Sequence, residues 1–470
     1  MRIRRNSVDS ILNNLPTEQL PLSEEEKKRV LNLALQKAAQ RRISVAPPQK
    51  RRSQLPVRAA AFFAAACLLT VGAAAAAPVV GDLVSGKISF FSNAKKQDSV
   101  QNPVDAPRGD YAGQQADLES HNITVGQTVT LDGIDYTLDT LSMDSASLDC
   151  FFTISGKNVV SKFLDSSIPQ PEWYQLGLNA PFLLAQINED EPLDQMQDDL
   201  YRKDDNSFQY WAHFQLPAEP QGDTITLKLY DTAAMNGDEG LSYTVQLNGK
   251  QVRAGARHVE PATLDFGLSD AILGNNPITL DSLCFGTGSG TLVTHSAGEM
   301  ILTDDTGKQL LPSYADGMLT DYTAYTLPAE NAKSITFTPV YSQGEQNTEY
   351  RTVTTAEMEQ GVQIAISDVG GYTLQNFKAQ GQALTWQMIP YGYTGPTAEL
   401  FPQDEAYIDT NTNSYALISS QVDPTTGIIT CRQDYYTADP AQVAKISEFQ
   451  YIFTSGYTKD ESKSITLPLE

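Results

Sequence analysis

The side chains that most often do chemistry are few in this chain, and their spacing completes no catalytic motif. The sequence contains no G-x-S-x-G nucleophile turn, no H-E-x-x-H metal motif, no C-x-x-C pair and no Walker phosphate loop. The four histidines are widely scattered, at His121, His213, His258 and His295. We therefore expect no enzymatic activity, no cofactor and no metal site. A pair of carboxylates of the glycosidase kind is the open alternative, because acidic residues are abundant.

Three short segments resemble parts of known sites. G-T-G-S-G at 286–290 joins two strand-like runs without a helix N-terminus to bind phosphate, so we interpret it as a turn. Ser92 and Lys95 have S-x-x-K spacing, but the companion motifs of such enzymes are missing. D-T-N-T-N-S at 409–414 begins like a calcium loop, yet serines stand at its sixth and twelfth positions, which favours a turn over a weak cation site.

Three of the four cysteines, Cys150, Cys284 and Cys431, lie beyond residue 80. Cys150 alternates along the chain with apolar residues that would share its face of a strand, namely Leu148, Phe152 and Ile154. This pattern is typical of a small buried hydrophobic residue. Three cysteines allow at most one disulfide, and we expect none.

The one candidate binding surface is a helix face near the N-terminus. Ser23 and Glu26 form a capping box for a helix predicted over 24–42, after a shorter helix over 6–15. The apolar face of the longer helix consists of Val30, Leu31, Ala34, Leu35 and Ala38. Because a segment this small cannot bury such a face well, we expect it to bind a cytoplasmic partner. Contact of the basic residues with anionic lipid alone is the alternative.

Next along the chain, residues 59–80 are uncharged and rich in alanine, and as a helix they would cross a bilayer, spanning roughly 33 Å. Residues 1–58 carry thirteen Lys/Arg and five Asp/Glu, whereas residues 81–470 carry twenty and fifty-two. This asymmetry predicts a cytoplasmic head at 1–58, a transmembrane helix at 59–80 and an extracytoplasmic remainder in the cell membrane. A buried helix, a signal peptide cleaved after the A-A-A at 75–77 and a lipoprotein site at Cys67 are less favoured.

Beyond a stalk at 81–115, strand-like alternation replaces helical periodicity. One element recurs as Y-T-L-D-T-L at 136–141, I-T-L-D-S-L at 278–283 and Y-T-L-Q-N-F at 372–377. A second follows each copy, as D-T-I-T-L-K-L at 223–229, K-S-I-T-F at 333–337 and K-S-I-T-L-P-L at 463–469. This alternation predicts a mainly β fold of tandem immunoglobulin-like β-sandwich units, at 116–239, 240–345 and 346–470. Between the copies, the acidic run at 197–206 reads as a solvated insertion.

The layout resembles a family of membrane proteins. Its features are the L-S-x-E-E-K-K-R-V helix of the basic head, the alanine-rich span and the exit sequence A-A-P-V-V-G-D-L-V-S-G-K-I-S-F-F at 76–91. Together they resemble the single-pass, anti-sigma-factor-like proteins of Gram-positive bacteria whose outer part is a domain of unknown function. The resemblance implies a sigma factor as partner of residues 1–58 and an envelope-sensing role for the outer part. The zinc-binding His/Cys head of the best-known anti-sigma factors is missing.

Two functions follow as expectations. The first is a regulator that couples an unknown extracellular ligand to a cytoplasmic partner through a helix in the lipid bilayer, with no direct nucleic-acid binding. The second is a binding or structural protein of the cell envelope, anchored by the same helix.

Overall fold

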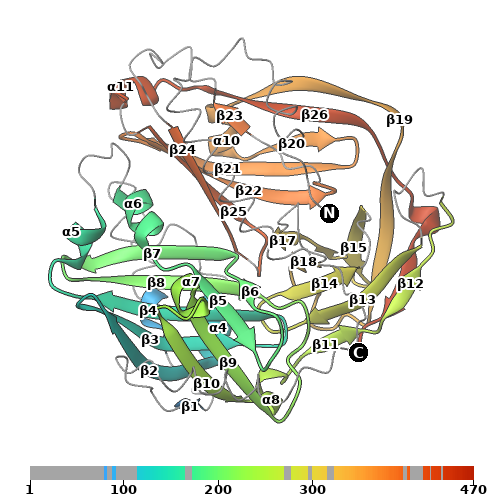
Figure 1. Cartoon of the computed structure of the whole chain (residues 1–470). Coiled ribbons are helices and arrows are strands. Elements are labelled where there is room, and N and C mark those ends of the chain that lie inside the picture. Colours follow the sequence, from blue (N-terminus) through green and yellow to red (C-terminus); the bar gives the residue numbers. More distant parts are fainter. Residues whose placement is uncertain are drawn as a thin grey trace, which may run out of the picture. The chain divides into compact units, whose positions relative to one another are not determined.

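The computed structural model describes residues 79–81, 87–91, 114–164, 172–268, 277–294, 299–314, 322–394, 400–402, 416–423, 425–435 and 438–470. The fold is mainly β, with several sheets of largely antiparallel strands and a few short helices, as the sequence predicts (Figure 1). Within the described ranges, no helix has both the length and the hydropathy needed to cross a membrane. The head helices and residues 59–78 of the predicted span lie outside these ranges.

Two five-stranded sheets form the first part of the fold. One sheet has the order β1 (Val79–Gly81), β10 (Ser242–Asn248), β9 (Thr224–Asp231), β5 (Leu183–Ile187) and β6 (Leu193–Asp194). The other has the order β2 (Asn122–Leu131), β3 (Ile134–Met143), β4 (Ser147–Ser155), β8 (Ser207–Gln215) and β7 (Gln197–Asp204). Buried side chains of both sheets make one hydrophobic cluster between Ile123 and Val252, which we call the first core.

Local sequence explains much of this part. Asp132 and Gly133 adopt the positive φ angles that a two-residue hairpin turn requires, and they connect β2 to β3. Side chains on β4 and β8 alternate between the two sides of the sheet, yet all nine residues of β8 are buried. The second sheet is therefore covered on both faces, and its outer face carries the polar and aromatic groups described below.

The predicted C-terminal end of the transmembrane helix, at residue 80, is wrong. Val79 and Val80 belong to β1, which pairs in parallel with β10 through Val245, Gln246 and Leu247. A β-branched pair before Gly81 suits a strand, and pairing with the edge strand β10 satisfies its backbone.

The second part of the fold is centred on a six-stranded sheet. Its strands are β11 (Arg257–Val259), β13 (Ile278–Phe285), β14 (Gly290–Thr294), β18 (Tyr322–Tyr325) and β17 (Pro312–Tyr314), with β12 (Ala262–Leu264) also on β13. These strands pack with β15 (Met300–Asp304), β16 (Gln309–Leu310) and the start of β19 (Ser334–Thr354). The shared hydrophobic cluster, from Val259 to Tyr341 plus Leu469, is the second core.

The remaining strands extend an eleven-stranded sheet. Its order is β16-β15-β19-β26-β20-β21-β22-β25-β24, and β23 and β27 pair off this path. The strands not yet given are β20 (Val362–Ser367), β21 (Gly370–Gln380), β22 (Ala383–Gly392), β23 (Leu400–Pro402), β24 (Ala416–Val422), β25 (Ile429–Tyr435), β26 (Glu448–Lys459) and β27 (Ile465–Pro468). Their cluster from Val353 to Tyr451 is the third core. The long strand β19 links the two regions, because its start pairs with β15 and its end with β26.

The described helices are short and lie in the connections between strands. They are α4 (Gln115–Ser120), α5 (Val159–Phe163), α6 (Glu172–Asn179), α7 (Thr232–Met235), α8 (Gly249–Val252), α10 (Thr355–Gln360), α11 (Pro440–Val443) and the 3₁₀ helix η4 (Glu461–Lys463). Asp231, Asn248 and Asp439 accept backbone hydrogen bonds at the starts of α7, α8 and α11, and Thr354 forms a capping box with Glu357 at α10.

Each of the six copies of the repeated elements contributes to a strand, but the strand pairings cross the predicted unit boundaries. The third copy of the second element forms β27, which pairs antiparallel with its second copy at the start of β19. Leu469 accordingly packs in the second core. Residues 241–252, placed in the second unit from sequence, pack in the first core because β10 pairs directly with β9.

The acidic segment 197–206 is not a solvated insertion. Residues 197–204 form β7, in which Asp199, Leu200 and Tyr201 are buried. Pairing with β8 and burial of Leu200 and Tyr201 on opposite sides of the sheet outweigh the charge of the segment.

Candidate functional site

The head face predicted to bind a partner lies outside the described residues. Val30, Leu31, Ala34, Leu35 and Ala38 therefore keep that role only as a prediction. The same holds for Ser92, Lys95 and the 409–414 segment.

The first structural feature of functional interest is an aromatic cluster on the outer face of the second sheet. Ile88, Phe90 and Phe91 come from the predicted stalk and pack against Phe151 and Trp211, with Tyr201 and Leu118 completing the cluster. The ring centroid of Phe90 lies 5.2 Å from that of Tyr201, and Phe91 meets Phe151 edge to face at 5.4 Å. The Tyr201 hydroxyl donates to the carbonyl of Ser89. Residues 88–91 are thus fixed to the first part of the fold.

A buried carboxylate joins the first and second parts. Asp144 lies in the turn between β3 and β4, where its Oδ1 accepts from the amides of Ala146 and Ser147 at 2.7 and 2.8 Å. Its Oδ2 accepts from the amides of Thr287 and Gly288, at 2.7 and 3.2 Å, and from the Thr287 hydroxyl. The carboxylate therefore satisfies donors from both loops at once.

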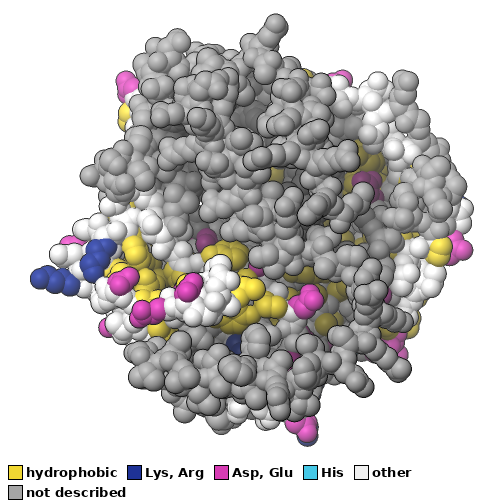
Figure 2. Space-filling view, in the orientation of Figure 1, with side chains coloured by type: hydrophobic (Ala, Val, Ile, Leu, Met, Phe, Trp, Pro, Cys, Tyr) yellow, Lys and Arg dark blue, Asp and Glu magenta, His cyan; other side chains and the backbone are white. Residues whose placement is uncertain are grey.

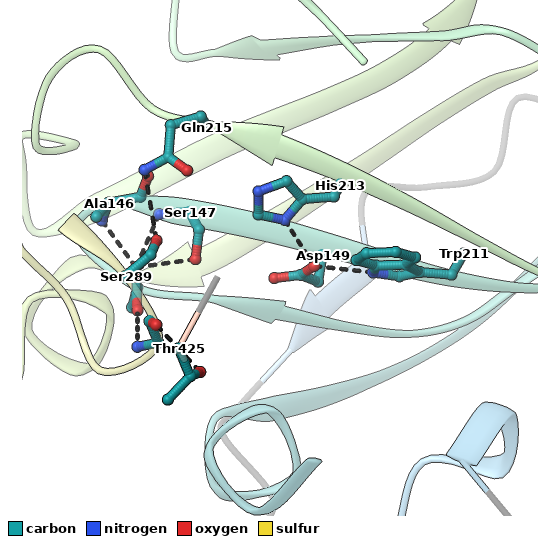
Figure 3. Close-up of polar contacts among 10 residues, drawn as sticks. Ala146, Ser147, Asp149, Trp211, His213, Gln215, Ser289 and Thr425 are labelled. Carbon is teal, nitrogen blue, oxygen red and sulfur yellow. Dashed lines mark hydrogen bonds and ion pairs between the residues drawn. The ribbon is translucent and has the colours of Figure 1, made fainter. Parts of the chain in front are cut away.

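The G-T-G-S-G segment at 286–290 is the turn between β13 and β14, as predicted. Its amides do bind an anion, but the anion is the side chain of Asp144. A Cβ atom on Gly286 would overlap the Asp144 carboxylate, so only glycine fits there. Nearby, the Gln215 amide donates to the carbonyl of Ala146 (Figure 3). It also donates to Thr291 Oγ1 at 2.5 Å, which again links the two parts.

Three potential metal ligands gather beside this turn. Glu219 follows β8, His258 lies on β11 and Cys284 lies on β13; their ligand atoms are all within 4.8 Å of one another. His258 Nε2 is 3.6 Å from Glu219 Oε1. The Ser145 hydroxyl donates to Glu219 Oε1, and the Cys284 thiol donates to the carbonyl of Ser145. The trio therefore combines one side chain from the first part with two from the second.

The electrostatics of this trio keep the thiol protonated. Burial, followed by the nearby carboxylates of Glu219 and Asp144, raises the pKa of Cys284 to about 12. As a neutral thiol, Cys284 is a weak nucleophile at neutral pH. A bound cation would reverse this, because metal coordination favours the thiolate.

A second buried polar group lies on the outer face of β4 and β8. Asp149 Oδ1 is 2.8 Å from His213 Nδ1 and also accepts from the Trp211 indole at 2.8 Å (Figure 3). All three side chains are buried. Burial alone would lower the pKa of His213, but the charge of Asp149 and hydrogen bonds to Asp149 and Gln215 outweigh it, so the pKa is raised. The hydrogen bonds of this pair with the Trp211 indole and with Gln215 are those of a structural polar network.

The cysteine predictions are confirmed. Cys150, Cys284 and Cys431 are buried free thiols, and Cys150 packs in the first core with Leu148, Phe152 and Ile154. Burial also raises the pKa of Cys431 to about 12. The absence of enzymatic activity stays a prediction.

Sequence reasoning missed both Asp144 and the Glu219–His258–Cys284 trio. Asp144 and the Gly288 amide that it binds lie 144 positions apart in the chain, and no local spacing connects Glu219 with His258 and Cys284. The one usable signal was the glycine-rich turn itself, whose amides can surround an anion.

No protein-family model and no curated protein matches the chain. About half of the chain, 49%, is structurally similar to a conserved domain protein from the Gram-positive Bacillus anthracis, at 10% identity and a TM-score of 0.31 over 81% of that chain. A weaker likeness, with a TM-score of 0.12 and 10% identity, is to a complex of Dpr2 Ig1-Ig2 with DIP-Theta Ig1-Ig3, over 69% of this chain and 99% of that chain. At these scores, neither likeness bears on function.

Proposed function

We propose that the protein is a single-pass membrane regulator of the anti-sigma-factor-like kind. Its cytoplasmic head, residues 1–58, binds a partner, and its tandem immunoglobulin-like units lie outside the membrane. A span reduced to 59–78 by strand β1 still measures about 30 Å as a helix, which matches the hydrocarbon core.

The observation that supports this proposal is the attachment of the chain just beyond the span. Residues 79–81 pair with β10, and Phe90 and Phe91 are buried in the aromatic cluster. A flexible stalk would separate movements of the outer part from the helix. An attached segment instead passes a displacement of the outer part to the span, which is what a regulator requires.

The predicted helix of the cytoplasmic head also supports the proposal. A lipid anchor needs basic residues but no defined helix start, whereas the capping box at Ser23 and Glu26 specifies one. Its apolar face therefore suits a protein partner, and the resemblance described above makes a sigma factor the first candidate.

The test is co-purification of cytoplasmic proteins with the full chain from membranes. Leu31→Asp/Leu35→Asp places two charges on the apolar face and should abolish partner capture, because burying them unpaired costs a few kcal/mol. Asn32→Asp/Gln36→Asp is the matched control, since it adds the same charge on the opposite face of the predicted helix. That control should retain the partner.

An envelope binding or structural protein is the second candidate function. It is favoured by the acidic outer part, which suits a cationic ligand; scattered Asp and Glu side chains are seen on the face shown in Figure 2. If the wild-type chain captures no soluble partner, or if both double variants lose it equally, this second function becomes the better one.

A further inference from the structure

We propose that Glu219, His258 and Cys284 form a zinc site that bridges the first and second parts of the fold. The proposal stands independently of the regulatory function. It rests on the convergence of three different ligand types on one point from β11, β13 and the segment after β8.

The distances between the three ligand atoms are close to those of a tetrahedral zinc site. Tetrahedral zinc, with metal–ligand distances of about 2.0–2.3 Å, holds its ligand atoms roughly 3.3–3.8 Å apart. His258 Nε2 and Glu219 Oε1 are already 3.6 Å apart, and no pair in the trio exceeds 4.8 Å. Side-chain rotations that bring the sulfur nearer by about 1 Å complete the three-ligand set, and water fills the fourth position.

The ligand types select the metal. Thiolate and imidazole together favour zinc over magnesium or calcium, which prefer oxygen ligands. Binding replaces the thiol proton of Cys284 with the ion and releases that proton to solvent, while neutral His258 binds through Nε2. Affinity therefore rises with pH.

The hydrogen bonds around the three ligands and the exposure of His258 to solvent are also consistent with a zinc site. The Ser145 hydroxyl donates to Glu219 and orients the carboxylate, as outer-shell partners of metal ligands do. The His258 side chain is 38% exposed, so an ion can enter from solvent on that side, whereas Cys284 is 5% exposed. His258 is further held by paired backbone hydrogen bonds with Glu470.

The site has a structural consequence. Glu219 belongs to the segment that leaves the first core, whereas His258 and Cys284 lie on the sheet of the second core. A bound ion would therefore cross-link the same two parts that Asp144 joins, and the link would depend on zinc concentration.

The experiment uses the full chain in detergent, stripped with a chelator and titrated with Co²⁺ and then Zn²⁺. We expect one Co²⁺ per chain, with thiolate-to-cobalt absorption that Zn²⁺ abolishes by displacement. Cys284→Ser should remove the absorption, whereas Cys150→Ser and Cys431→Ser, at buried thiols outside the trio, should keep it. Glu219→Gln and His258→Gln should each weaken Zn²⁺ binding at least tenfold.

A second measurement guards against variants that fail to fold. Zn²⁺ should raise the Tm of the wild type but not that of His258→Gln, whose substituted side chain is partly exposed and whose apo form should keep the wild-type Tm. Thiolate absorption that persists in Cys284→Ser, or Zn²⁺ affinity unchanged in all three ligand variants, would overturn the proposal.

Discussion

At the scale of single residues, Asp144 joins two loops that lie far apart in the sequence. Its two carboxylate oxygens accept five hydrogen bonds of 3.2 Å or less, from the 146–147 and 287–288 segments. Removing a buried acceptor leaves its donors without partners, which costs more than the hydrogen bonds themselves contribute.

Asp144→Ala should therefore lower the free energy of unfolding by about 2–5 kcal/mol. Asp238→Ala, at an exposed aspartate in the turn after α7, should change it by less than about 0.5 kcal/mol. Denaturant unfolding of the two variants and the wild type measures the difference. Equal stability of the two variants would show that the carboxylate does not join the loops.

The His213–Asp149 pair makes stability depend on pH. Because the pKa of His213 is raised in the folded state, the pair contributes fully below the unfolded pKa of about 6.5, and this contribution is lost as pH rises through the folded pKa. The stability advantage of the wild type over His213→Gln should thus be largest below about pH 6.5 and shrink as the pH rises through the raised folded pKa. Urea titrations at several pH values test this, and an advantage that grows with pH would be inconsistent with the pair.

At the scale of elements, the segment 88–91 is attached to the first part of the fold by its aromatic side chains. Phe90 is fully buried and Phe91 nearly so, although they follow a predicted span and precede α4 by more than twenty residues. Burial of two aromatic rings holds this segment in place, together with hydrogen bonds from the Ile88 amide to Glu119, from the Ser89 hydroxyl to Gln209 and from the Tyr201 hydroxyl to the Ser89 carbonyl.

Phe90→Ala should lower the free energy of unfolding of the first part by about 3–5 kcal/mol, the usual cost of emptying a buried aromatic site. Phe182→Ala is the matched control, because the Phe182 side chain is 50% exposed. Thermal unfolding followed by circular dichroism compares them. A Phe90→Ala variant as stable as the control would mean that the segment does not pack on the sheet.

Strand β27 is the second informative element. It pairs with the start of β19, and its Thr466 hydroxyl meets that of Thr336 at 2.9 Å. Truncation after Ser464 should remove exchange protection from the β19 amides that pair with β27, while β21 and β22 of the third core keep theirs. Hydrogen exchange followed by mass spectrometry reads both regions in one sample. Loss of protection in both would indicate that the two cores unfold together.

At the scale of the whole molecule, the charge division sets the expected topology. Protease added to intact protoplasts should digest residues 120–470 and leave a membrane-bound fragment that contains the head and span. An antibody to the head and one to the outer part detect the two products by immunoblot. Protection of the outer part in intact cells would contradict the orientation.

The sequence by itself determined the features that depend on neighbouring residues. Alternation of apolar residues predicted the strands and the burial of Cys150, and Asp132-Gly133 specified a hairpin. The glycines at 286–290 predicted the turn that connects β13 and β14. These features follow because side-chain direction and backbone preference are local properties of the chain.

Only the tertiary structure decided which distant segments meet. Val79 and Val80, expected at the end of a helix, form a strand with β10. The charged segment of β7 is partly buried, and Leu469 after β27 packs in the second core. The tertiary structure also brought Glu219, His258 and Cys284 together, and filled the glycine-rich turn with the Asp144 carboxylate. Sheet pairing and burial between segments far apart in sequence outweigh local preference, and no residue spacing encodes them.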